Sequence, residues 1–252
     1  MFELNKIYNA EAIEFMSQLP DNSVDMILCD LPYGTTACKW DNIIPFDKLW
    51  EQYERIAKDN TAIVLTAQTP FDKVLGASNL KLLKYEWIWE KTQATGHLNA
   101  KKMPMKAHEN ILVFYKNIPT YNPQKTQGHK PINSGTRRLD ATNNNYGTFT
   151  KELPFGGDTD RYPRTVLKFK SDKQTDYLHP TQKPLALFEY LIKTYTNEGD
   201  IVLDNCMGSG TTAVACKNTG RNFYGCELDE KYCEIANKRL KSVQGNLFGA
   251  VA

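Results

Sequence analysis

The stretch Asp-Ile-Val-Leu-Asp-Asn-Cys-Met-Gly-Ser-Gly-Thr-Thr, residues 200–212, decides the fold of this chain. Its apolar run ends in an acid, which predicts a buried strand over 200–204. Its glycines predict a tight loop, and the residues that follow predict a helix over 211–218. A second strand over 223–227 and a second helix over 229–240 come next. A βαβα order of this kind predicts a parallel sheet with right-handed crossovers.

The loop and the end of the second strand predict a site for a nucleotide-like cofactor. Gly208 and Gly210 permit close approach of the backbone to a ligand, and Glu227 is placed to accept both hydroxyls of a ribose. Through Ala213 the pattern also matches the dinucleotide fingerprint Gly-x-Gly-x-x-Ala, so an NAD-binding oxidoreductase is an alternative. Asp204 favours S-adenosylmethionine (SAM), because a carboxylate attracts the ammonium group of methionine and repels a pyrophosphate.

A second stretch, Asp30-Leu31-Pro32-Tyr33-Gly34, follows another short apolar run. This order predicts a buried parallel strand that delivers a rigid loop at its carboxyl end, where open α/β sheets keep their ligands. The Asp30 carboxylate and the Leu31 carbonyl are two acceptors, Pro32 stiffens the loop, and Tyr33 adds a flat face. These groups suit a planar ligand with an amino group, such as a nucleobase. The alternative is an ordinary turn with Tyr33 as packing.

The remaining pattern predicts helices and strands on both sides of a long irregular region. Strands are expected over 6–8, 61–66, 85–90 and 110–115, and helices over 10–18, 46–58, 71–77 and 185–195. A polar, basic loop is expected over 91–108, and regular elements are not expected over 116–177. Residues 81–178 carry 17 Lys and Arg against 9 Asp and Glu, and the remainder carries 14 against 20. A basic region with interleaved aromatics suits nucleic acid, although a solvated or disordered insert is the alternative.

Composition bounds the class of protein. The 252 residues suit one α/β domain with an insertion or two small domains, and 41% apolar residues suffice for a core. A run of about 18 apolar residues and a signal pattern are both absent from the sequence, so we expect a cytoplasmic protein without a membrane partner. The six cysteines form no Cys-x-x-Cys pair. We therefore expect no metal site and a reducing compartment.

Three motifs in order carry a resemblance to a known family. Residues 30–33 resemble the Asp-Pro-Pro-Tyr motif of amino-methyltransferases that methylate adenine N6 in DNA, with Leu31 in place of the first proline. Residues 202–212 look like their cofactor motif, and 179–184 look like the element that precedes it in their permuted β class. The resemblance covers nearly the whole chain except 117–178.

This resemblance implies a Rossmann-like SAM-dependent methyltransferase fold with a mostly parallel, seven-stranded sheet and circularly permuted motif order. Residues 1–116 would form the catalytic half, 117–178 a target-recognition insertion, and 179–252 the cofactor-binding half. Glu11 would lie near the cofactor adenine, Thr181 and Lys183 near the methionine carboxylate, and Glu227 on the ribose. The implied cofactor site as a whole is Glu11, Asp30, Thr181, Lys183, Asp204, Met207, Gly208, Ser209, Gly210, Thr211 and Glu227.

The implied reaction is transfer of the methyl group of SAM to N6 of a flipped adenine in double-stranded DNA. Asp30 and the Leu31 carbonyl would hold the amino hydrogens, and Tyr33 would stack on the base. N4-cytosine methylation is the nearest rival, and Asp at position 30, where serine is commoner in cytosine enzymes, favours adenine. Methylation of RNA or of a protein glutamine, and a non-catalytic role in nucleic-acid binding, are less favoured. The chain would act as a monomer or homodimer, with a cognate restriction endonuclease as a possible partner.

Overall fold

The computed structural model describes residues 2–34, 41–131, 142–143, 147–148, 158–172 and 182–248, of which 142–143, 147–148 and 244–248 are described by their backbone. The chain forms two compact units. The larger contains residues 1–122 and 165–252, and the smaller contains residues 123–164.

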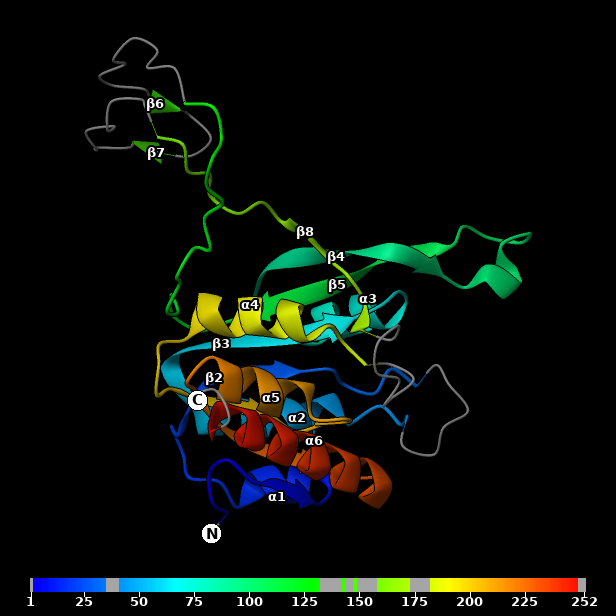
Figure 1. Ribbon diagram of the computed structural model, residues 1–252, viewed down its shortest axis with the longest axis vertical. Helices are drawn as coiled ribbons and strands as arrows, with labels where there is room; N and C mark the ends of the chain where they lie inside the picture. Colours follow the sequence, from blue (N-terminus) through cyan, green and yellow to red (C-terminus); the bar gives the residue numbers. More distant parts are fainter. Residues whose placement is uncertain are drawn as a thin grey trace. The chain divides into compact units, whose positions relative to one another are not determined.

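The larger unit is built on an eight-stranded sheet with the order β1-β10-β9-β2-β3-β5-β4-β8. All neighbouring strands pair in parallel except β5, which runs antiparallel to both β3 and β4. The strands are β1 (Ile7–Asn9), β2 (Val24–Cys29), β3 (Ala57–Ala67), β4 (Leu83–Thr95), β5 (Lys106–Phe114), β8 (Val166–Phe169), β9 (Ile201–Asp204) and β10 (Asn222–Glu227). Figure 1 shows this sheet between two groups of helices.

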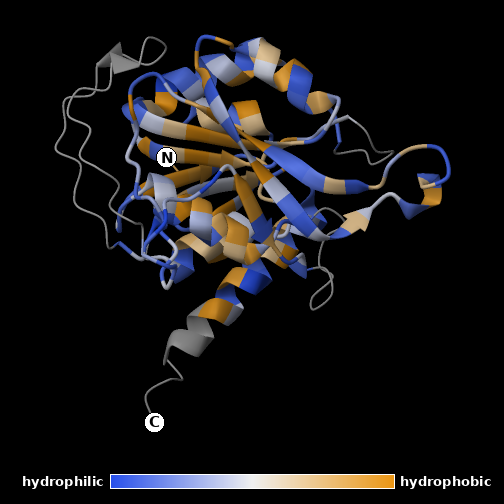
Figure 2. Cartoon of the chain, turned by 90° about the horizontal axis from the view of Figure 1, so that it is seen from above, coloured by the Kyte–Doolittle hydropathy of each residue, from blue (hydrophilic) through white to orange (hydrophobic). Residues whose placement is uncertain are grey.

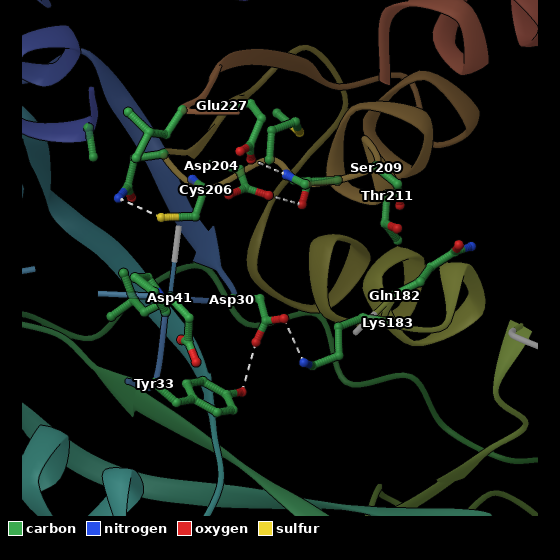
Figure 3. A pocket seen from close by; sticks show the side chains of 18 of the residues that line it. Asp30, Tyr33, Asp41, Gln182, Lys183, Asp204, Cys206, Ser209, Thr211 and Glu227 are labelled. Atoms are coloured by element: carbon green, nitrogen blue, oxygen red, sulfur yellow. Dashed lines mark hydrogen bonds and ion pairs between the residues drawn. The ribbon is translucent and has the colours of Figure 1, made fainter. Parts of the chain in front are cut away.

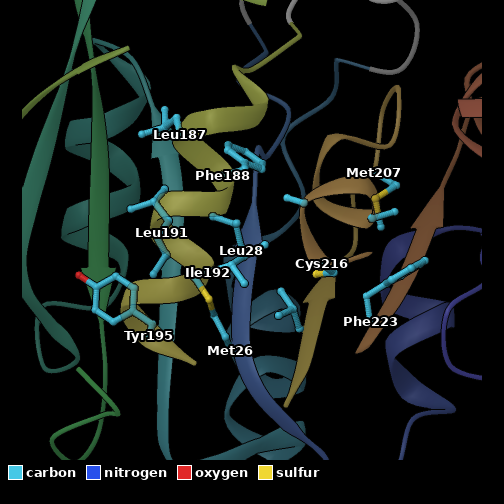
Figure 4. Close-up of a cluster of buried hydrophobic side chains, with 14 of the residues drawn as sticks. Met26, Leu28, Leu187, Phe188, Leu191, Ile192, Tyr195, Met207, Cys216 and Phe223 are labelled. Atoms are coloured by element: carbon cyan, nitrogen blue, oxygen red, sulfur yellow. The ribbon is translucent and has the colours of Figure 1, made fainter. Parts of the chain in front are cut away.

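Three helices pack on each face of the sheet. They are α1 (Ala12–Ser17), α2 (Phe46–Ile56) and α3 (Phe71–Ser78) on one face, and α4 (Leu185–Tyr195), α5 (Thr211–Asn218) and α6 (Glu230–Phe248) on the other. Alternation along β2 feeds both faces, because Met26 and Leu28 pack with α4 while Ile27 and Cys29 pack with α1 and α2. Figure 4 shows the apolar side of α4 against β2, and Figure 2 shows how the apolar residues gather on the strands.

Most predicted elements are present, and two expectations need correction. The sheet has eight strands, not seven, because Val166–Phe169 pairs with β4 inside a region in which no regular element was expected. The loop expected over 91–108 is shorter, because β4 continues to Thr95 and β5 begins at Lys106, with Thr95 paired to Lys106. The tip carries a short 3-10 helix, η1 (His97–Asn99). None of the described helices is long and apolar enough to cross a membrane.

The smaller unit, residues 123–164, is narrower than the expected insertion, 117–178. Its strands β6 (Thr142–Asn143) and β7 (Gly147–Thr148) pair antiparallel, and Thr126 bridges to Arg161. The Arg161 guanidinium donates to backbone carbonyls, including that of Asp160 at 2.8 Å, and the Lys125 ammonium lies 4.6 Å from the ring centroid of Tyr162. The target-recognition role of this region stays a prediction.

The start of α5 generates a first prediction. Gly210 has φ +81°, and a Cβ there would lie 3.0 Å from the Ala236 Cβ on α6. We expect Gly210→Ala to lower the free energy of unfolding by about 2–4 kcal/mol, since a left-handed backbone and a crowded contact both oppose the added methyl. Gly208→Ala is the matched control, because φ is +52° but nothing lies within 4 Å. Equal losses in urea unfolding would contradict the packing argument.

Candidate active site

One cavity of about 530 Å³ opens at the carboxyl ends of the parallel strands. The chain leaves β2 toward β3 on one side and leaves β9 toward β10 on the other, so the cavity lies at a topological switch point of the sheet. Its walls come from both halves of the chain, including Asp30, Lys183, Asp204 and Glu227. Figure 3 shows these side chains pointing into the same space.

Asp204 closes β9 and is buried at the wall of the cavity. Its Oδ1 accepts from the Cys206 N–H at 3.0 Å, and its Oδ2 accepts from the Thr212 hydroxyl. Burial raises the pKa of this carboxyl to about 7, and the two hydrogen bonds only partly offset the cost of removing a charge from water. An acid of this kind becomes more easily ionised when a cation binds beside it.

Glu227 ends β10 and fixes the glycine loop. Its Oε2 accepts from the Gly208 N–H at 2.7 Å, and its Oε1 accepts from the Asp229 N–H at 2.9 Å. Burial raises the pKa of Glu227, while these backbone donors work in the opposite direction. On the outer side of the loop, Arg239 of α6 donates to the Ser209 carbonyl at 3.3 Å and to the Thr211 hydroxyl at 3.1 Å.

The Asp30 side chain is held by three donors. Its Oδ1 accepts from the Tyr33 hydroxyl at 2.7 Å and from the Thr66 hydroxyl, and its Oδ2 lies 2.6 Å from the Lys183 Nζ. Figure 3 shows the contacts to Tyr33 and Lys183 as dashed lines. Burial raises the pKa of Tyr33 well above its usual value, and the Asp30 charge acts in the same direction. The phenol therefore remains a donor to Asp30.

Lys183 belongs to a chain of four alternating charges. Its Nζ contacts Asp30 and lies 3.3 Å from the Glu109 Oε2, while the Glu109 Oε1 lies 2.6 Å from the Lys91 Nζ. Burial works against the charge on Lys183, but Asp30 and Glu109 outweigh it and raise the pKa well above its usual value. Burial likewise opposes the Glu109 charge, yet Lys183 and Lys91 keep the pKa of Glu109 low.

The loop that carries Asp30 is held from two sides. Leu31 is buried among the apolar residues of α1 and α2, and the Tyr33 ring packs on Phe71 of α3 with centroids 5.0 Å apart. Gly34 has φ +65°, and its N–H donates to the Asp41 carboxylate at 2.9 Å. These contacts fix where the loop points its acceptors.

The cavity brings together most of the residues expected at the site. Its lining includes Glu11, Asp30, Leu31, Pro32, Tyr33, Lys183, Asp204, Met207, Gly208, Ser209, Thr211 and Glu227. Gly210 packs against Ala236 of α6, and Thr181 lies outside the described residues. Glu11 caps α1 by accepting from the Glu14 N–H at 2.9 Å. Lys183 lines the cavity and contacts Asp30, and its expected place near a cofactor carboxylate stays a prediction.

Several site residues were absent from the expected set, among them Thr66, Lys91, Glu109, Gln182 and Thr212. Glu109 and Lys91 flank a basic loop. The sequence has no pattern that predicts their contact with Lys183. Thr66 ends a predicted strand, and a hydroxyl at a strand end is the one hint that it could reach a neighbouring loop. Among the described residues, no group of three or more His, Cys, Asp or Glu could hold a metal ion.

Known proteins similar to this chain are DNA methyltransferases. A family model described as DNA methylase, named for N6 and N4 methyltransferases, matches residues 24–238. Type II methyltransferase M1.MboII of Moraxella bovis is 29% identical, with 98% of this chain and 100% of that protein covered. The solved complex of M1.HpyAVI with SAM is 27% identical with a TM-score of 0.64, covering 93% of this chain and 98% of that one.

A further solved structure supports the fold alone. The cytosine-N4-specific PvuII DNA methyltransferase has a TM-score of 0.67 at 14% identity and covers 96% of this chain and 92% of its own. The predicted α/β methyltransferase fold is thus confirmed, with the correction from seven strands to eight.

The charge chain generates a second prediction. We expect Lys183→Met to lower the free energy of unfolding by about 3–5 kcal/mol, because it leaves two largely buried carboxylates, Asp30 and Glu109, without their shared cation. Lys168→Met is the matched control: its Nζ lies 2.8 Å from the Glu90 carboxylate, but the Lys168 side chain is largely exposed and that of Glu90 partly so. The control should lose about 0–1 kcal/mol in the same denaturant titration. Losses of similar size in both variants would show that burial of the four charged side chains does not determine the loss of stability.

Proposed function

The chain belongs to the N6/N4 family of DNA methylases, and from this premise we propose that it transfers the methyl group of SAM to N6 of a flipped adenine in double-stranded DNA. The observation that carries the proposal is the meeting of two loops in one cavity. The Asp30–Tyr33 loop supplies acceptors for an amino group, and the 204–211 loop with Glu227 supplies a cofactor site. One cavity lined by both can place a nitrogen beside a methyl donor.

The residues present fit SAM, which is the cofactor. Asp204 and Glu227 are buried acids with raised pKa values, and a cationic ligand favours the charged form of such acids. The Gln182 Oε1 is buried at the cavity and has no hydrogen-bond partner among the described residues, so it can accept from a ligand donor. In this arrangement Asp204 would attract the methionine ammonium, and Glu227 would accept from the ribose hydroxyls. When bound, SAM supplies a methyl group activated by a sulfonium.

Asp30 retains the capacity to bind the target amine. A carboxylate offers about four acceptor positions, and Tyr33, Thr66 and Lys183 use three of them. The fourth lies on Oδ2, and the Leu31 carbonyl adds a second acceptor nearby. Two acceptors match the two hydrogens of an exocyclic NH2. Holding both hydrogens turns the nitrogen lone pair toward the methyl group, and most of the rate gain comes from this positioning.

The target base must leave the duplex to reach the cavity, because Asp30 lies at the wall of a pocket and a base inside the stack cannot approach it. Adenine N6 and cytosine N4 present the same amino group to such a pair of acceptors. The Asp30-Leu31-Pro32-Tyr33 sequence supports adenine through its resemblance to the Asp-Pro-Pro-Tyr motif. Methylation of cytosine is the outcome that would correct the base while keeping the fold and the cofactor.

The test is incubation with labelled SAM and mixed-sequence duplex DNA, followed by nucleoside analysis of the digest. We expect N6-methyladenine from the wild type. Asp30→Asn, which keeps the size of the side chain, should lower the rate by about 100-fold or more, because its amide replaces an acceptor with a donor. Its SAM affinity should stay within a few-fold. N4-methylcytosine as the product, or full activity in Asp30→Asn, would overturn this assignment.

The pKa of Asp204 generates a prediction for cofactor binding. Because the pKa is raised to about 7, the carboxyl is protonated below that value and ionised above it. We expect SAM affinity to rise by up to about tenfold per pH unit as the pH approaches 7 from below, and to level off above. Asp204→Asn should bind SAM more weakly and with a flatter profile, any remaining slope belonging to Glu227. Calorimetric titration of both proteins between pH 5 and 9, about two units either side, checks this; a flat wild-type profile would contradict it.

A further inference from the structure

The hairpin formed by β4 and β5 extends beyond the other strands of the sheet. Its two strands pair from Leu83 with Phe114 to Thr95 with Lys106. Figures 1 and 2 both show it projecting away from the helices. We define residues 96–105 as the hairpin tip. Gly96, with φ +88°, turns the chain into the short helix η1.

The hairpin tip exposes large apolar side chains. Leu98 is 88% exposed, Met103 is 54% exposed and Met105 is 41% exposed. Leu98 is the most exposed large hydrophobic side chain among the described residues. A single exposed leucine is ordinary, but three such side chains on one projecting tip form a surface that a partner can cover.

The same segment is basic. Residues 96–106 contain Lys101, Lys102 and Lys106, together with His97, and no Asp or Glu. Lys106 also fixes the base of the tip, because its Nζ donates to the Gln68 Oε1 at 2.7 Å. Lysines beside exposed apolar groups suit a partner that combines phosphates with stacked apolar faces, which describes duplex DNA.

The hairpin tip is continuous with the active site. Trp89, Lys91, Gln93 and Thr95 of β4 line the cavity that holds Asp30, and so does Gln68, to which the hairpin is bonded. Thr95 is directly followed by the tip. A DNA molecule that delivers a base to this cavity therefore passes beside Leu98.

We propose that the hairpin tip enters the duplex and that Leu98 fills the space in the base stack left by the flipped nucleotide, while Lys101 and Lys102 bind the flanking phosphates. This inference rests on the proposed function, since it requires a flipped base. An extruded base leaves its neighbours unstacked, and an apolar side chain that occupies the gap stabilises the extruded state. Leu98 is then a positioning residue that acts through the DNA.

The experiment compares methyl transfer to two short duplexes that carry the methylated site, one with the target adenine paired and one with it opposite a mismatched base. We expect Leu98→Ala to lose about tenfold on the paired duplex and to come within about twofold of the wild type on the mismatched one, where flipping is easier. Leu80→Ala is the matched control. Leu80 is 70% exposed and precedes β4 at the opposite end of that strand, so this variant should match the wild type on both duplexes.

A merely structural role of Leu98 would lower activity on both duplexes alike, and an unchanged rate on the paired duplex would equally overturn the proposal. In either case a wild type that methylates adenine in both duplexes still supports the proposed function. Failure of the Leu98 proposal can therefore be distinguished from failure of the proposed function.

The double variant Lys101→Ala with Lys102→Ala provides a second readout. We expect weaker binding of both duplexes. The slope of log binding constant against log salt concentration should become shallower by about two phosphate contacts. An unaltered salt dependence would remove these lysines from the DNA interface.

Discussion

The site depends on parallel pairing between β2 and β9. Met26 pairs with Val202 and Ile27 with Leu203, and the Ile201 N–H donates to the Asp25 carboxylate at 2.9 Å across 176 residues of sequence. Because both strands run in the same direction, the loops that follow them emerge at one edge of the sheet. The Asp30–Tyr33 loop and the 204–211 loop therefore share a cavity although they lie in opposite halves of the chain.

Four largely buried charges then fix the Asp30–Tyr33 loop within this frame. Each of Asp30, Lys183, Glu109 and Lys91 would be costly to remove from water alone, but their signs alternate along the chain of contacts and their sum is zero. Charge-assisted hydrogen bonds are short and strong, and the Asp30 carboxylate accepts from Tyr33 and Thr66 as well as contacting Lys183. These three contacts restrict the orientation of the carboxylate, as its proposed role in aiming the lone pair of an amine requires.

Local pattern was sufficient for elements whose apolar face and ends lie within their own sequence. The bounds predicted for α4 and α5 coincide with those in the structure for this reason. Local pattern was insufficient for β8, because this segment forms a strand by pairing with the edge strand β4. The same distinction holds at the site. The acids at strand ends could be predicted from the sequence. The pairing of Lys183 with Asp30 and Glu109 could not, because it joins segments that are distant in the sequence and have no shared pattern.

Charges of opposite sign lie in different parts of the fold, which allows the protein to bind both a cationic cofactor and the anionic backbone of DNA under the proposed function. The cavity is rich in carboxylates, with Asp204 and Glu227 on the cofactor side, and it suits a cation. Such a cavity by itself repels the phosphates of DNA. Lys91 and Lys183 also line the cavity, but Asp30 and Glu109 balance their charges. Two further lysines, Lys101 and Lys102, lie outward at the hairpin tip, and the Debye length of about 8 Å at physiological salt limits how far their charges act. Under the proposed function, the phosphates are held at the hairpin tip while a base, which is neutral, enters the cavity.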